Sequence, residues 1–362
     1  MLATKSEGNV KFVVGADVFF NPEGELCRDL SVAALSAWLS GRKSARGVVV
    51  LDALAGCGIR GLRYAVECGI PVVLNDVSKS AVREIKKNVL LNKVKRKCKV
   101  RNEDARKLMA SERFDVIDLD PFGSPAPFLD TAAISIKSNG MLAITATDEA
   151  ALNGSAQRAG IHKYGIVTRR THFYTELGIR NLITSISLTC ARHDKAAIPL
   201  FCFVDKHYYR AFMQVSDKKS QISEILKNIK IFYYCDKCGE FSDDFICQIC
   251  GSKKHPLGPT YLGKINDEHF CEKMLRAIQK FDFKMKEKET KMLTATMSEA
   301  DAPLYFDLHK LASKHKFNLN KISDVIEALK ANGFSASRSA LCPTGIKTNA
   351  RLADLLKILK TR

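Results

Sequence analysis

A carboxylate and an aromatic ring stand two residues apart in the run Asp-Leu-Asp-Pro-Phe-Gly, residues 118–123. Phe122 offers a flat face on which an unpaired base can stack, and Asp120 offers an acceptor for the N–H groups of an exocyclic amine. Such an amine is a poor nucleophile, so group transfer to it needs an acceptor that holds its hydrogens as positive charge develops. The alternative is a proline-rich turn whose aspartate caps the next helix.

A glycine-rich turn occupies residues 51–61, between a β-rich and a helical segment. Gly56, Gly58 and Gly61 match G-x-G-x-x-G, in which the missing side chains let a ligand approach the backbone and the start of a helix. Asp76 lies eighteen residues past Gly58 and ends the next predicted strand, where it can accept hydrogen bonds from ribose hydroxyls. The pattern also fits a nicotinamide cofactor, although nothing nearby resembles a hydride-transfer site.

These residues fall at the ends of alternating β-rich and helical segments. The predicted strands span residues 48–51, 71–74, 98–101, 114–119 and 141–145, and the clearest helix spans residues 78–91 with Ser78 as its cap. Parallel strands need helical crossovers, so the alternation predicts an α/β fold with a doubly wound, Rossmann-like sheet. Ligands of such sheets gather at the carboxyl edge, which is where the third strand would also bring Asp104 and Ala105. Two later segments, 201–204 and 210–215, are predicted to add an antiparallel edge.

Four of the twelve cysteines form two C-x-x-C pairs, Cys235 with Cys238 and Cys247 with Cys250. Each pair supplies two thiolates from one tight turn, and two pairs complete a tetrahedral S4 site that suits a structural zinc ion. Redox dithiols are the alternative. The remaining cysteines are scattered, which indicates a reducing compartment rather than a disulfide framework.

The 362 residues carry 57 lysines and arginines against 39 acidic residues, a net charge of +18. This excess favours a polyanionic partner, with a merely basic protein as the alternative. The length and composition predict two folded domains, 1–215 around the sheet and a smaller α+β unit, 216–362, around the zinc site. Residues 304–362, at the end of the second domain, are predicted to form two helices, a hairpin and a third helix. No long apolar run or signal peptide is apparent, so we expect a cytoplasmic protein.

Read together, the motifs resemble one enzyme family over about residues 5 to 350. The segments that carry the resemblance are Asn21-Pro22, 27–32, 51–64, Asn75-Asp76, 118–129, 145–148, 176–180, 207–210 and 345–348. The chain is similar to the tRNA (guanine-26) N2-dimethyltransferases, which use S-adenosylmethionine. The resemblance implies a class I methyltransferase sheet with tRNA as partner. It also implies cofactor contacts from a set of five residues, Arg28, Arg60, Asp76, Asp104 and Ala105, and Asp120 as the catalytic carboxylate beside Phe122.

Two rival functions stay open at this stage. One is an amino-methyltransferase acting on another RNA or on DNA, and the other is a zinc-dependent tRNA-binding protein with an inactive pocket. We expect residues 216–362 to dock tRNA. The basic run 83–107 could contact phosphate, and a solvated helix face is the equal alternative. The aromatic cluster 207–210 could contact RNA, and a packed hairpin is the equal alternative. We expect a monomer.

Overall fold

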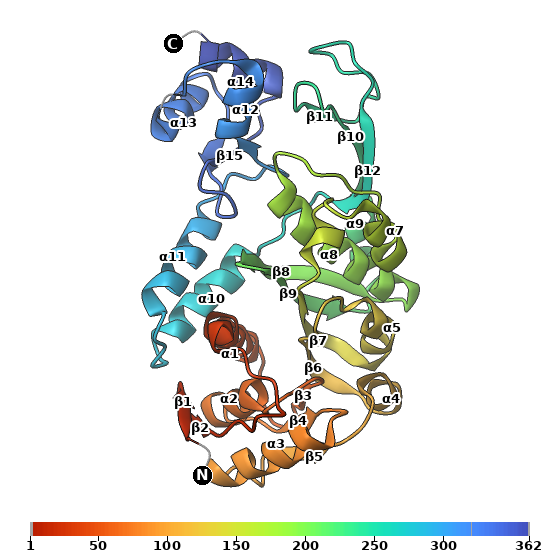
Figure 1. Cartoon of the computed structure of the whole chain (residues 1–362), viewed down its shortest axis with the longest axis vertical. Coiled ribbons are helices and arrows are strands. Elements are labelled where there is room, and N and C mark those ends of the chain that lie inside the picture. Colours follow the sequence, from red (N-terminus) through yellow and green to blue (C-terminus); the bar gives the residue numbers. More distant parts are fainter. Residues whose placement is uncertain (1–2, 320, 361–362) are drawn as a thin grey trace.

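A seven-stranded mixed sheet forms the centre of the protein (Figure 1). The computed structural model describes residues 3–319 and 321–360. The sheet has the order β5-β4-β3-β6-β7-β9-β8, in which β5 to β7 are parallel and β9 runs antiparallel to both of its neighbours. Its strands are β3 (Val50–Asp52), β4 (Val72–Asn75), β5 (Cys98–Arg101), β6 (Phe114–Leu119), β7 (Ile136–Ala146), β8 (Ala196–Asp205) and β9 (Tyr208–Ser216). The predicted doubly wound α/β sheet and its antiparallel edge are confirmed.

Helices cover both faces of the sheet, because every side chain of the central strands β3 and β6 is buried and both faces need apolar cover. One face carries α1 (Glu25–Ser40), α2 (Ile59–Glu67) and α3 (Lys79–Leu91), and the other carries α4 (Ala105–Ser111), α5 (Ala126–Ser135) and α8 (Tyr174–Arg192) (Figure 1). The short helices α6 (Glu149–Leu152) and α7 (Gln157–Tyr164) precede α8, and a hairpin of β1 (Lys5–Glu7) and β2 (Val10–Phe12) begins the chain. None of the described helices is both long enough and apolar enough to cross a membrane.

The chain after residue 216 adds a small sheet and a helical unit. Helix α9 (Lys219–Lys227) leads into an antiparallel sheet of β10 (Ile229–Tyr234), β11 (Phe241–Ser242) and β12 (His255–Tyr261). The helical unit contains β13 (Phe306–Asp307), α12 (Leu308–His315), α13 (Ile322–Ala331), β14 (Ala336–Arg338), β15 (Gly345–Thr348) and α14 (Leu352–Lys360). The expected order of helix, helix, hairpin and helix is present, with the short strand β13 added beside β15.

Between these parts, α10 (Glu268–Ile278) and α11 (Lys286–Met297) return to the large sheet and lie beside α1 (Figure 1). Their side chains Phe270, Met274 and Leu293 are buried in the same apolar core as the side chains of α1 and α2. The predicted division into 1–215 and 216–362 was drawn where the composition changes. In the structure, α10 and α11 belong to the second of these segments but pack against the sheet domain of the first. The boundary as a folding unit stays a prediction.

A buried ion cluster joins the helical unit to α8. Glu176 accepts hydrogen bonds from Arg180 on the same helix, at 2.9 Å, and forms an ion pair with Lys347 of β15, at 3.0 Å. Lys347 also pairs with Glu299, at 3.2 Å. Two positive and two negative groups thus neutralise one another in a region closed to solvent, which stabilises them only while the helical unit stays docked.

The packing of α10 generates a test. Met274 is fully buried, so Met274→Ala should lower the free energy of unfolding of the whole chain by about 2–5 kcal/mol. Arg276→Ala, on the exposed face of the same helix, should change it by less than about 1 kcal/mol, because its ion pair with Glu272 is exposed. Urea denaturation measures both. Equal, small effects would mean that α10 is not part of the sheet core.

Candidate active site

A cavity of about 560 Å³ opens at the carboxyl edge of the sheet, within the size range of sites for small ligands. Its walls come from the ends of β3, β4, β6 and β7 and from residues 17–28. Most of the predicted site residues meet there: Arg28, Arg60, Asp76, Asp120 and Phe122 all line the cavity. The sheet brings them together because parallel strands end at one edge.

The glycine turn forms the floor of the cavity. Gly58 has a left-handed backbone (φ +85°) where α2 begins, and a Cβ atom on Gly61 would overlap Leu74 of β4. The turn is held to the next strand, because the Gly56 N–H donates to Asp76 Oδ2 over 2.9 Å. Asp76 also accepts from the Ser78 N–H and lines the cavity, so the remaining lone pairs of its carboxylate can serve a ligand.

Asp104 and Ala105 do not line this cavity. Asp104 caps α4 instead, where its carboxylate accepts from the Arg106 N–H over 2.8 Å and pairs with the Arg106 guanidinium. The hydrogen bond from the Arg106 side chain lowers the pKa of Asp104 to about 2. Ala105 is buried beneath it. The sequence thus predicted the correct edge of the sheet for these two residues but not the direction of the Asp104 side chain.

A buried charge network lies behind Asp120. The carboxylate of Asp118 is closed to solvent and accepts from Arg210, at 2.6 and 3.0 Å, and from the Tyr64 hydroxyl, at 2.5 Å. Arg60 lies 3.7 Å from Asp118 and donates to Asp120 at the cavity wall. The two arginines therefore balance the charge of two carboxylates. Asp118 is closed to solvent, and Asp120 faces the cavity.

This network sets the proton affinity of the two cavity carboxylates in opposite directions. Burial acts to raise the pKa of Asp120, but the positive charges of Arg60 and Arg210 outweigh it and hold that pKa below its usual value. Burial raises the pKa of Asp52 to about 7, the nearby Asp118 charge adds to the rise, and Arg60 opposes it. Asp120 is consequently an ionised acceptor and a weak base at neutral pH.

Two aromatic rings stand at the mouth of the cavity. Phe122 and Phe19 are 74% and 58% exposed, and their ring centroids lie 4.3 Å apart at 78°. Two exposed rings in contact with each other at a cavity mouth offer an apolar surface that a flat ligand can cover. Sequence reasoning missed Phe19, because residues 13–24 show no periodicity; its nearness to Asn21-Pro22 was the only signal.

Sequence reasoning also missed the group that holds Arg28. Glu7 of the first hairpin accepts two hydrogen bonds from the Arg28 guanidinium, each 2.6 Å long, and a third from Arg63 at 3.0 Å. The Asn21 carbonyl accepts from Arg28 as well, at 3.1 Å. Bidentate pairing of this kind fixes a guanidinium plane, so Arg28 is held against the cavity before any ligand binds.

The four cysteines of the two C-x-x-C pairs meet at one point. Their Sγ atoms all lie within 4.8 Å of one another, and Cys235 to Cys250 and Cys238 to Cys247 are 3.5 and 3.3 Å apart. Four thiolates bonded to zinc at about 2.3 Å lie roughly 3.8 Å apart, so this spacing fits a tetrahedral metal. The main-chain N–H groups of Gly239 and Gly251 close the turn in each pair.

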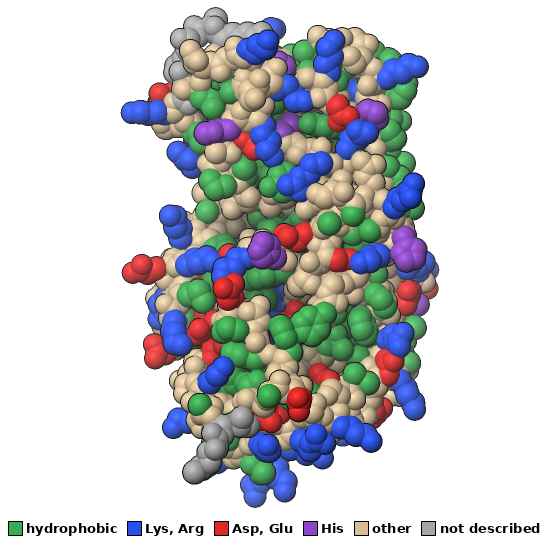
Figure 2. Space-filling view, viewed as in Figure 1, with side chains coloured by type: hydrophobic (Ala, Val, Ile, Leu, Met, Phe, Trp, Pro, Cys, Tyr) green, Lys and Arg blue, Asp and Glu red, His purple; other side chains and the backbone are tan. Residues whose placement is uncertain are grey.

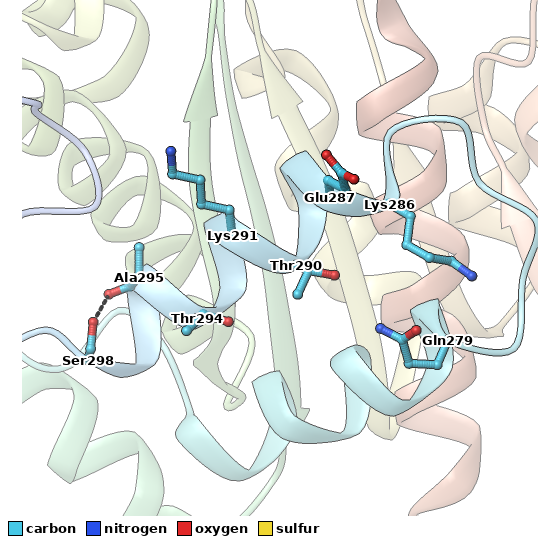
Figure 3. Close-up of a pocket in the computed structure, with 8 residues that line it drawn as sticks. All are labelled: Gln279, Lys286, Glu287, Thr290, Lys291, Thr294, Ala295 and Ser298. Atoms are coloured by element: carbon cyan, nitrogen blue, oxygen red, sulfur yellow. Dashed lines mark hydrogen bonds between the residues drawn. The ribbon is translucent and has the colours of Figure 1, made fainter.

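A second, shallow depression of about 620 Å³ runs along α11 (Figure 3). In Figure 3 the side chains of Lys291 and Glu287 point to one side of α11, and those of Thr290 and Thr294 point to the other. The depression shares no lining residue with the cavity at the sheet edge. It contains none of the residues that the motifs single out, so we place the chemistry in the cavity at the sheet edge.

A family model described as N2,N2-dimethylguanosine tRNA methyltransferase matches residues 2–360. The chain belongs to this family. Among its relatives, proteins named tRNA (guanine(26)-N(2))-dimethyltransferase are 36% identical in Methanosarcina acetivorans, over 95% of this chain and 92% of the relative, and 35% identical in Pyrococcus abyssi, over 96% and 94%. The resemblance seen in the sequence is confirmed.

A solved structure of a family member has the same fold. The complex of Trm1 from Pyrococcus horikoshii with S-adenosyl-L-methionine superposes with a TM-score of 0.89 at 33% identity, covering 99% of this chain and 100% of that one. The match includes the residues after 216 as well as the sheet. The whole architecture is thus that of the family.

Asp52 predicts a pH dependence of stability. Its pKa is raised from 3.8 to about 7 in the folded protein, so the stability that it contributes is fully present below about pH 4 and is lost as the pH rises through 7. Asp52→Asn cannot titrate and should lose less free energy of unfolding than the wild type between about pH 5 and pH 8. Urea denaturation at each pH measures this, and parallel profiles for the two proteins would contradict the raised pKa.

Proposed function

We propose that the protein transfers methyl groups from S-adenosylmethionine to the exocyclic N2 of guanine 26 in tRNA and forms the dimethylated base. The observation that carries this proposal is the Asp120 carboxylate, which Arg60 and Arg210 keep ionised at the wall of a nucleotide-sized cavity beside two exposed aromatic rings. Membership of the family supports the same reaction and makes the two rival functions unnecessary.

The cofactor fits the half of the cavity that faces the glycine turn. Asp76 would accept from the ribose hydroxyls, and Arg28, already fixed by Glu7, would bind the carboxylate of the methionine part. Arg60 lines this half and balances the charge of Asp120. Asp104 and Ala105 stay proposed adenine contacts, but the Asp104 side chain must first leave Arg106.

The base would enter on the other side of Asp120. S-adenosylmethionine supplies an electrophilic methyl group, and the protein must hold the amine in line with it. Asp120 accepts an amine N–H as positive charge develops on N2, with help from the main-chain carbonyl of Pro121, and takes the proton during or after transfer. Phe122 would offer a stacking face to the base, and Phe19, which packs edge-on against Phe122, would support that ring.

The four-cysteine cluster would hold a structural zinc ion. Cys235, Cys238, Cys247 and Cys250 supply all four ligands of a tetrahedral site, which leaves no open position for catalysis. The loops between β10, β11 and β12 carry these residues, so the metal would stabilise the small sheet rather than the cavity.

Docking of tRNA would depend on the residues after 216. The stretch 303–362 contains eleven basic and four acidic residues, and Figure 2 shows lysines and arginines over the upper end of the molecule and along the lower rim beneath α3. The basic run 83–107, which begins within α3, would add phosphate contacts. We also propose that the protein acts on tRNA in the cytoplasm and works there as a monomer.

Mass spectrometry of nucleosides tests the function directly. An unmodified tRNA transcript incubated with the protein and S-adenosylmethionine should yield N2-methylguanosine followed by N2,N2-dimethylguanosine. A transcript with adenine at position 26 is the control and should yield neither. Tight cofactor binding without any methylated guanosine would favour the inactive tRNA-binding protein, and methylated adenine or cytosine would favour another amino-methyltransferase.

Asp120→Asn should slow methyl transfer by roughly 10²- to 10⁴-fold, because the neutral amide is a much poorer acceptor for a developing cation. Its affinity for S-adenosylmethionine should stay within a few-fold of the wild type. Asp76→Ala is the counterpart and should weaken cofactor binding by about 1.5–3 kcal/mol through lost hydrogen bonds to a charged acceptor. Calorimetry and single-turnover rates separate the two, and wild-type rates for Asp120→Asn would remove it from the reaction.

Metal analysis of protein purified without chelator should find one zinc ion per chain. Cys238→Ser should lose that metal and become sensitive to proteolysis between β10 and β12, because metal binding to such sites contributes on the order of 10 kcal/mol to folding. Cys68→Ser, at a half-buried cysteine of the sheet domain, should keep the zinc. Protein that contains no zinc and a disulfide between Cys235 and Cys238 would support the redox alternative.

A further inference from the structure

One hydroxyl group in the wall of the main cavity is still without a role. Tyr208 begins strand β9 and lines the same cavity as Asp120. Its hydroxyl is closed to solvent and finds no hydrogen-bond partner among the residues that the structure describes. Buried hydroxyls are nearly always hydrogen-bonded in folded proteins. Because the Tyr208 side chain lines the cavity, a ligand that displaces the atoms now covering the hydroxyl can supply the missing partner.

The strand order places Tyr208 in the half of the cavity that would receive the base. Tyr209 pairs with Ala146 across β9 and β7, so Tyr208 stands at the edge where β7 ends. Along this edge the order is β3, β6, β7 and β9, with the glycine turn after β3 and Asp120 after β6 (Figure 1). Tyr208 therefore lies beyond Asp120 as seen from the cofactor turn.

The surroundings hold the ring in place and keep its hydroxyl protonated. The Phe203 ring contacts Tyr208 edge to face, with centroids 5.9 Å apart. Two ion pairs, Lys206 with Glu23 and Asp205 with Lys288, each 2.8 Å long, tie down the hairpin that carries it. Burial raises the pKa of Tyr208, so the hydroxyl is a hydrogen-bond donor throughout the neutral range.

We propose that the Tyr208 hydroxyl donates a hydrogen bond to O6 of the target guanine. This inference rests on the proposed function. Guanine presents O6, N1–H and the N2 amine along one edge, and the acceptor-only carboxylate of Asp120 can bind the amine but not the carbonyl oxygen. A donor at the other end of that edge fixes the base within its plane, which the stacking rings cannot do alone. Tyr208 is thus the second anchor that aligns N2 with the methyl group.

The hydrogen bond from Tyr208 contributes differently to the alignment of the base in the two methylation steps. After the first transfer, N2 carries one hydrogen fewer, so its contact with Asp120 is weaker. The contact between Tyr208 and O6 is unchanged, because O6 takes no part in the reaction. Tyr208 therefore contributes more to the alignment of the monomethylated base than to that of the unmodified base.

The variant Tyr208→Phe removes only the hydroxyl and tests this role. Its thermal midpoint should equal or exceed that of the wild type, since no internal hydrogen bond is lost, and its affinity for S-adenosylmethionine should stay within twofold. The value of kcat/KM for a tRNA transcript should fall about five- to tenfold, and N2-methylguanosine should accumulate. The control Tyr209→Phe changes the neighbouring ring, which is buried in the core on the opposite face of the sheet, and should leave the product ratio unchanged.

A transcript with 2-aminopurine at position 26, which keeps the amine and lacks O6, identifies the atom that Tyr208 contacts. The wild type and Tyr208→Phe should methylate this transcript at nearly equal rates, because the partner of the hydroxyl is gone. An equal loss for Tyr208→Phe on guanine and on 2-aminopurine, or weaker cofactor binding, or no loss on guanine, would overturn the proposal. A wild-type enzyme that leaves guanine 26 unmodified would overturn the proposed function itself, a separate result.

Discussion

The carboxylate of Asp118 is the group on which the site depends. It lies at the end of a central strand with no solvent access, and a buried carboxylate is strongly disfavoured unless cations and hydrogen bonds compensate it. Arg210 supplies two hydrogen bonds from the antiparallel strand and Tyr64 supplies one from α2. The same demand for positive charge keeps Arg60 buried, where it reaches Asp120. One ion cluster thereby joins three elements and prepares the acceptor at the cavity wall.

Much of this arrangement could be predicted from sequence where local chemistry determines the backbone. The alternation of segments gave the parallel sheet, Ser78 caps α3 as expected, and the glycine turn stands where α2 begins. Parallel strands end at one edge, so Asp76 and Asp120 could be placed in one cavity from their order in the chain. The spacing of the cysteines alone predicted that their sulfur atoms meet.

The rest depended on contacts between residues distant in sequence. Nothing local links Glu7 to Arg28, or Phe19 to Phe122, because these pairs form only when the first hairpin and the segment 13–24 after it pack against the sheet domain. The local partner of Asp104 was not foreseen either: Arg106, two residues on, binds its side chain at the start of α4, and a position at the carboxyl edge of the sheet does not reveal that contact. The packing of α10 against the sheet domain could not be predicted from sequence either. The apolar stripe of α10 indicates that the helix packs against something, but it does not identify the partner.

That return has a consequence for how the protein is made. The apolar face of α1 is synthesised early, whereas α10 and α11, which cover it, follow about 230 residues later. A ribosome that adds roughly 5–20 residues per second leaves this face uncovered for at least ten seconds. The sheet can form in that interval, but one of its two cores stays unfinished until the second half of the chain has emerged. Chaperones that bind exposed apolar helices therefore have a defined window on the nascent chain, and it closes when α11 docks.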